Sequence, residues 1–181
     1  MRDRSPALHR GSHGRILGWG LVVSTIAIAL GACVDETHAL QVDALGGEAP
    51  GVPKGPMHRP GQPCLVCHGE AGPSSTQFVI AGTVTESQGK TGPANGAQVQ
   101  IEDVTGSTYT ATTNEVGNFY ITPDQWSPTM PLQVLVSQGK NDQSMLTHIG
   151  RAGSCAECHT PTPGPSSPGP IYVVSAPTGA P

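Results

Sequence analysis

Between residues 78 and 149 the chain carries short segments in which apolar and polar side chains alternate. These segments are rich in Val, Ile, Thr and aromatic residues, and Gly, Asn, Asp and Pro occupy the joints between them. They are FVIAGTVTE (78–86), AQVQIEDV (97–104), STYTATT (107–113), NFYIT (118–122), LQVLVSQ (132–138) and QSMLTHI (143–149). No window has the period of a long amphipathic helix. The pattern therefore predicts a mainly β fold, namely a small antiparallel β-sandwich.

Two stretches within this region, GAQVQIED and TTNEVGNFYI, resemble the carboxypeptidase regulatory-like, or prealbumin-like, domain over residues 77–149. The resemblance implies that Gly117 belongs to a tight hairpin and that the Phe119 side chain enters the core. A scaffold of this kind carries many unrelated functions, so it does not indicate one by itself. The function has to come from the segments on either side.

The N-terminus has the order of an export signal. Arginines precede an apolar run at 16–30, and LGAC follows at 30–33. LGAC resembles the lipobox of bacterial lipoproteins, which implies a signal peptide at 1–32 and a diacylglycerol on the thiol of Cys33. A transmembrane helix is the weaker alternative, because the 15 residues of the run are fewer than the ~20 that span a bilayer. An ordinary signal peptide with a coincidental cysteine is the other alternative.

Two further segments are predicted to be connections. Residues 33–56 have no sustained period and collect Gly and Pro toward their end, which predicts a flexible tether. Residues 161–181 form a Pro/Gly-rich tail, since a stretch such as TPTPGPSSPGP (160–170) cannot enter a helix or a central strand. Within the tail, IYVV (171–174) is expected to add one short edge strand.

Composition and charge limit the possible functions. The chain of 181 residues holds 24 Gly and 18 Pro and only 4% aromatic residues, so its core must be small. Once residues 1–32 are removed, five Lys and Arg remain against twelve Asp and Glu, a formal net charge of −7 compared with −4 for the whole chain. This balance excludes a basic nucleic-acid-binding surface.

Four of the five cysteines stand in two copies of one motif, CLVCH at 64–68 and CAECH at 155–159. This spacing lets two thiols add to the two vinyl groups of one haem, while the adjacent imidazole reaches the iron. The motifs resemble those of multihaem c-type cytochromes, which implies two covalently bound haem c groups. The attachment residues would be Cys64, Cys67, Cys155 and Cys158, and the proximal iron ligands His68 and His159.

Three other interpretations of the cysteines stay open. Two Cys-x-x-Cys pairs can form a four-thiolate zinc site, but such pairs usually stand ~15–20 residues apart, whereas 87 residues separate Cys67 from Cys155. Two disulfides are permitted in an oxidising compartment, yet they do not explain a histidine after each pair. A thioredoxin-like redox pair needs a βαβ setting, which the strand pattern does not provide.

The second axial ligand of each iron is less determined by the sequence. His58 precedes Cys64 by six residues and His148 precedes Cys155 by seven, each with a methionine close by. We therefore take His58 and His148 as candidate distal ligands, with either histidine free to serve either haem. The remaining candidates are His38, Met57, Met130 and Met145.

Together these features predict an exported, membrane-anchored dihaem c-type cytochrome that transfers electrons to or from a redox protein. Its haem-binding segments, 57–76 and 150–160, flank the sandwich, and no catalytic constellation is visible. Two other classes stay open: a β-sandwich surface or binding module with structural or sensory haems, and a haem enzyme with an open iron position. Val34 is not the aspartate that favours inner-membrane retention in some bacteria, so the outer membrane is the expected location.

The strand count predicts where the two motifs lie. Six antiparallel strands alternate in direction, so the start of the first strand and the end of the sixth share one end of the sandwich. The two haem-binding segments are therefore expected side by side, close enough for their haems to exchange electrons directly.

Replacement of Cys33 tests the anchor. Because the thiol would carry the lipid, Cys33→Ala is expected to release the protein from membranes or to block removal of the signal peptide. Membrane fractionation and intact mass measure both outcomes. A variant that stays membrane-bound and matures normally contradicts the lipobox interpretation.

Overall fold

In the computed structural model, residues 35–88 and 92–174 are described, and the chain divides into two compact units, 1–39 and 40–181. The predicted signal peptide and Cys33 lie outside the described residues. Among those that are described, no helix is long and apolar enough to cross a membrane.

Part of the predicted tether is helical. Helix α2 (Glu36–Ala44) occupies residues for which the sequence indicated no regular structure, and none of its residues is buried. The Asp35 carboxylate accepts a hydrogen bond from the backbone N–H of His38 (3.2 Å), as an N-cap does, and Glu36 adds negative charge to the first turn. This capping and the Ala, Leu and Gln residues that follow favour a helix without any amphipathic period.

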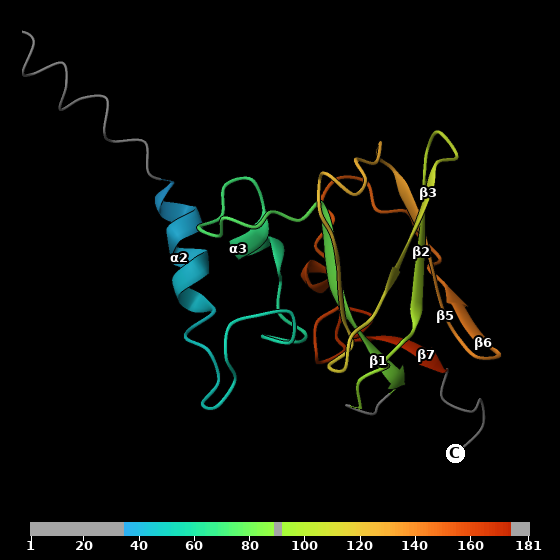
Figure 1. The fold of residues 1–181 in the computed structure, drawn as a ribbon, viewed down its shortest axis with the longest axis horizontal. Coiled ribbons are helices and arrows are strands. Elements are labelled where there is room, and N and C mark those ends of the chain that lie inside the picture. The colour runs from blue at the N-terminus through green and yellow to red at the C-terminus, as the bar shows by residue number, and fades with distance from the viewer. Residues whose placement is uncertain (1–34, 89–91, 175–181) are drawn as a thin grey trace, which may run out of the picture. The chain divides into compact units, whose positions relative to one another are not determined.

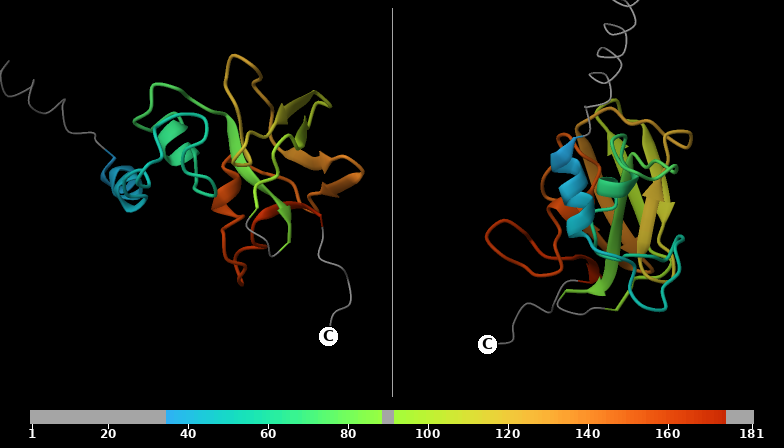
Figure 2. Two further views of the ribbon diagram at one scale, coloured as in Figure 1. Left: turned by 60° about the horizontal axis from the view of Figure 1, so that its bottom comes forward. Right: turned by 90° about the vertical axis from the view of Figure 1, so that its left-hand side faces the viewer.

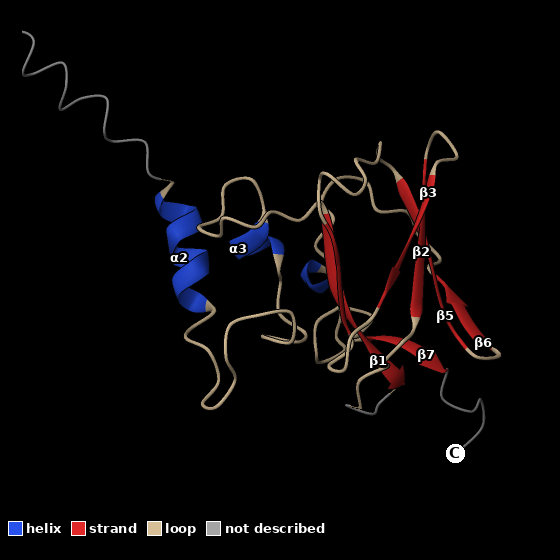
Figure 3. Ribbon diagram, in the orientation of Figure 1, coloured by secondary structure: helices blue, strands red, loops and turns tan. Residues whose placement is uncertain are grey.

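The second unit is a β-sandwich, which confirms the predicted mainly β fold (Figure 1). Two sheets form its layers, and Figure 2 shows them from two further sides. One sheet has the order β4 (Asn118–Ile121), β1 (Ile80–Ser87), β7 (Ile171–Val174); the other has the order β3 (Thr108–Thr112), β2 (Gln98–Asp103), β5 (Leu132–Gln138), β6 (Asn141–Ser144). Two short helical turns, α3 (Leu65–His68) and η1 (Cys155–Glu157), complete the regular structure of the described residues (Figure 3).

The core lies between the sheets and follows the alternation seen in the sequence. In β2, for example, Val99 and Ile101 are fully buried, while their neighbours Gln98, Gln100 and Glu102 are exposed. Full burial of one such side chain contributes ~1.5–3 kcal/mol to the stability of the fold. Short strands with regular alternation can therefore form a stable core. The other large buried side chains are Ile80, Val84, Phe119, Ile121, Leu132, Val136 and Val173.

Three details differ from the expectation. β7 pairs with β1 in parallel, so the sandwich is not wholly antiparallel. The turn at Gly117 (φ 79°) leads from β3 in one sheet to β4 in the other, rather than closing a hairpin, although Phe119 is buried as expected. The sixth strand covers 141–144 instead of 143–149. A two-residue turn after Gln138 pairs that residue with Asn141 and so begins the strand earlier.

Candidate functional site

The first motif forms a single helical turn, α3. The backbone N–H of His68 donates to the carbonyl of Cys64 (2.8 Å), and that of Cys67 donates to the same oxygen (3.1 Å). Residues three and four apart lie on one side of such a turn. The two thiols and the imidazole of CLVCH are therefore presented on a common side of the backbone.

The second motif repeats this backbone arrangement in η1. The N–H groups of His159 (2.8 Å) and Cys158 (3.2 Å) both donate to the carbonyl of Cys155. The first thiol of each motif also points back along the chain in the same way, because Cys64 Sγ lies 3.5 Å from the Gln62 carbonyl and Cys155 Sγ lies 4.0 Å from the Gly153 carbonyl. Two segments with different neighbours thus share one local structure.

Both motif histidines are held in the same tautomer. Nδ1 of His68 lies 2.8 Å from the carbonyl oxygen of Thr76, and Nδ1 of His159 lies 3.0 Å from that of Gly169. A carbonyl oxygen only accepts hydrogen bonds, so in the neutral form of each ring Nδ1 carries the proton and Nε2 keeps its lone pair. Metal-ligating histidines are typically oriented by this kind of hydrogen bond.

The loop that follows His68 fixes the orientation of its ring. This loop supplies the Thr76 carbonyl, and at its end the backbone N–H of Phe78 donates to the His68 carbonyl (2.7 Å). The Phe78 ring stacks on the His68 imidazole, with ring centroids 4.2 Å apart and planes inclined by 13°. The Tyr120 ring stacks on the other face of Phe78, with ring centroids 4.5 Å apart. The ring plane of His68 is therefore fixed by packing as well as by hydrogen bonding.

For His159, the carbonyl comes from the Pro/Gly-rich segment predicted to be a tail. Ser167 Oγ accepts hydrogen bonds from the backbone N–H groups of Thr160 (3.0 Å) and Gly169 (3.1 Å). These bonds close the segment into a loop that brings the Gly169 carbonyl to the imidazole. The tail assigned to 161–181 thus contributes to the second motif as well as adding β7.

The second motif packs directly on the backbone of β1. The N–H of Ala81 donates to the Gly153 carbonyl (3.0 Å), and Ser154 forms a parallel bridge with Ala81. A Cβ atom at Gly82 would lie 2.8 Å from Cβ and 2.9 Å from Sγ of Cys155, and one at Gly153 would lie 2.0 Å from the Val79 carbonyl oxygen. Only glycine allows this approach at either position. Figure 2 shows η1 beside β1.

The first motif is attached to the next residue of the same strand. Thr83 Oγ1 accepts a hydrogen bond from the N–H of Gly61 (2.8 Å) and donates to Asn118 Oδ1 (2.7 Å). Asn118 Nδ2 in turn donates to the His58 carbonyl (2.9 Å). The second motif and the residues that lead into the first therefore both contact the first half of β1, which is the shared end that the alternation of strand direction predicted.

The four motif cysteines are free thiols. Burial raises the pKa of the Cys64 thiol above its ordinary value and that of Cys155 to about 12. Repulsion from the thiolates of Cys64 and Cys158 adds to the shift at Cys155. Within 35–88 and 92–174, no group of three or more His, Cys, Asp or Glu side chains could hold a metal ion.

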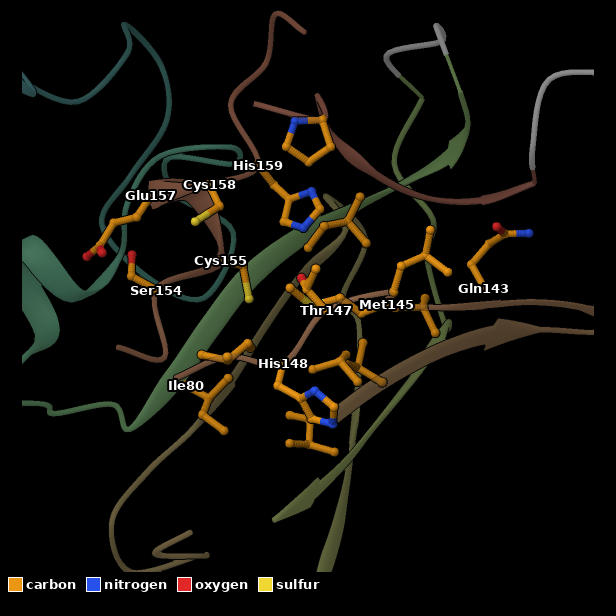
Figure 4. A pocket seen from close by; sticks show the side chains of 18 of the residues that line it. Ile80, Gln143, Met145, Thr147, His148, Ser154, Cys155, Glu157, Cys158 and His159 are labelled. Carbon is orange, nitrogen blue, oxygen red and sulfur yellow. The ribbon is translucent and has the colours of Figure 1, made fainter. Parts of the chain in front are cut away.

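A cavity of about 590 Å³ opens beside the second motif. Its walls combine core residues of both sheets, such as Ile80, Ile101 and Val134, with Cys155 and His159. In Figure 4 the Cys155 thiol lies between the imidazoles of His159 and His148. The volume falls within the ~300–1,000 Å³ of small-molecule sites. The cavity is thus a largely apolar space whose lining includes the thiols of Cys155 and Cys158 and the imidazoles of His148 and His159.

The other candidate ligands are distributed unequally. The His58 ring lies 5.8 Å from the His68 ring, measured between centroids, with an interplanar angle of 77°. Met145 lines the cavity with His148, whereas Met57 is exposed. Met130 packs against the core, and His38 lies in α2. The structure therefore brings His58 to the first motif and His148 to the second.

A carboxylate holds the His58 ring. Nδ1 of His58 lies 3.1 Å from Glu48 Oε1, and the same oxygen accepts a hydrogen bond from Arg59 Nε (3.2 Å). Partial burial acts to raise the pKa of Glu48, but the hydrogen bonds from Arg59 and His58 and the positive charge of Arg59 outweigh it and hold this pKa below its ordinary value. The sequence did not identify Glu48, Thr76 and Gly169 as hydrogen-bond acceptors of the histidines, because no motif fixes their spacing from these histidines.

No protein family, curated protein or solved structure matches this chain. Its function is therefore inferred from its own residues.

Substitution of Gly82 tests the seating of the second motif. Gly82→Ala is expected to lower the free energy of unfolding by about 1–3 kcal/mol, because the new methyl group overlaps Cys155. Gly150→Ala is the matched control, since a Cβ there meets nothing within 4 Å and the change should stay within about 0.5 kcal/mol. Urea unfolding measures both, and equal stability of the two variants would contradict the close approach.

Proposed function

We propose that the protein is an exported, lipid-anchored dihaem c-type cytochrome that carries electrons. The observation that supports this most is the matched pair of hydrogen bonds at His68 and His159. Each imidazole donates a hydrogen bond from its Nδ1–H to a backbone carbonyl, which leaves Nε2 available for a metal. Two unrelated loops reach this same arrangement, which a solvated histidine would not require.

The donor set fits haem c at both motifs. Cys64 and Cys67 would hold the first haem with His68 as proximal ligand, and Cys155 and Cys158 would hold the second with His159. The apolar cavity beside Cys155 suits the body of a porphyrin better than it suits a hydrated ion. Bound there, the haem iron supplies one-electron chemistry; the protein supplies the thiols, the oriented imidazoles and the exclusion of water.

The seating of both motifs on β1 supports direct electron exchange between the two haems. Gly82 meets Cys155 and Thr83 binds Gly61, so adjacent residues of one strand contact the two haem-binding segments. We propose that the haems act as a two-centre relay for a redox protein partner. The anchor at Cys33, with the outer membrane as the favoured location, belongs to the same proposal.

Covalent haem is tested by intact mass. After maturation with the cytochrome c assembly machinery and acid–acetone extraction, the protein is expected to retain two haem increments. Cys64→Ser/Cys67→Ser and Cys155→Ser/Cys158→Ser should each retain one, because each pair would attach its own haem. Protein made without that machinery is the control. Loss of all colour on extraction, or retention of zinc instead of iron, would show that the proposed function is wrong.

A further inference from the structure

We propose that Glu48, fixed by Arg59, is a positioning residue that holds the His58 imidazole as the ligand opposite His68 on the iron of the first haem. This inference rests on the proposed function. The inference adds two points to that function: two histidines act as a pair at one motif, and a carboxylate outside both haem-binding segments orients one of them.

The spacing of the two rings fits a shared metal ion. Metal–nitrogen bonds of roughly 2.0 Å on opposite sides of one ion put the centroids of two imidazoles about 6 Å apart. The centroids of His58 and His68 lie 5.8 Å apart. The ring orientation of His68 is fixed, because Phe78 stacks on it and the backbone carbonyl of Thr76 accepts a hydrogen bond from its Nδ1–H.

His58 is oriented from both its backbone and its ring. Its carbonyl accepts the hydrogen bond from Asn118 Nδ2, and its N–H donates to the Gly55 carbonyl (3.1 Å). Its Nδ1 faces the carboxylate of Glu48, which in the ionised form only accepts, so the proton lies on Nδ1 and Nε2 is free. His58 therefore has the same tautomer as the two motif histidines.

Arg59 explains why Glu48 is in place. Besides Glu48, its guanidinium donates to the carbonyl groups of Leu45 (3.2 Å) and Gly46 (2.5 Å) and to Gln62 Oε1 (3.0 Å). Arg59 has a φ of 50°, a left-handed conformation that is uncommon for residues other than glycine. The side chains of two consecutive residues, His58 and Arg59, thereby reach the same carboxylate oxygen.

A carboxylate is a stronger partner for an imidazole N–H than a carbonyl group is, because the hydrogen bond is charge-assisted. Such a partner increases the basicity of the ligating nitrogen. A more basic ligand stabilises the oxidised iron and lowers its reduction potential. Glu48 should therefore affect the potential of one haem, whereas a simple Glu48–Arg59 clamp would affect stability alone.

The experiment compares substitutions in the full dihaem protein. Glu48→Gln retains an acceptor for Nδ1 but removes the charge, so one haem should stay low-spin while its midpoint potential rises. His58→Ala should convert one haem per protein to a high-spin form that binds carbon monoxide. Glu102→Gln is the matched control, because Glu102 is an exposed carboxylate of β2 that lies outside both haem-binding segments; it should leave both potentials unchanged.

Absorption spectra with and without carbon monoxide, spectroelectrochemical titration and urea unfolding give the readouts. Repeating them in Cys155→Ser/Cys158→Ser, which would retain only the first haem, identifies the haem that responds. The inference is overturned if His58→Ala leaves both haems low-spin and inert to carbon monoxide. It is also overturned if Glu48→Gln changes stability but no potential. A protein without covalent haem by mass would instead refute the proposed function.

Discussion

The close packing of Cys155 against the backbone of β1 is the constraint on which the rest of the arrangement depends. Gly82 and Gly153 leave no room for one additional carbon atom where the second motif meets the strand. Thr83, the next residue, binds the segment of the first motif. Because successive residues of a strand face opposite sides, β1 receives the two segments from its two faces. The first half of β1 thus determines the positions of both.

The sandwich brings together motifs that are distant in the sequence. Bringing Cys67 and Cys155 together closes a loop of 87 residues, which costs conformational entropy. This cost grows only logarithmically with loop length. Burial of the Val, Ile and Leu side chains between the sheets compensates for that entropy. The residues before η1 then run parallel to the start of β1, which is the strand that follows the first motif. Fold and site therefore form together.

The sequence predicted those features that depend on neighbouring residues. Alternation located β1 to β5 to within two residues at each end, because the inner positions, such as Val99 and Ile101, must be apolar. The spacing within each Cys-x-x-Cys-His motif indicated a shared side of a helical turn. What escaped was the choice of hydrogen-bond acceptors. Every residue has a backbone carbonyl, so nothing in the sequence distinguishes that of Gly169 from those of its neighbours. Glu48 likewise has no fixed distance from His58.

The same requirement, a proton on Nδ1, is met by different groups at different histidines. Backbone carbonyls serve His68 and His159, whereas a carboxylate tied to Arg59 serves His58. Neutral acceptors and a charged acceptor do not make equally basic ligands, so two irons held in these surroundings would not have equal affinity for an electron. The apolar cavity beside Cys155 adds to the difference, because a less polar setting disfavours the more highly charged oxidised iron. On the proposed function, both effects would give the first haem the lower potential, and a relay with unequal centres has a preferred direction.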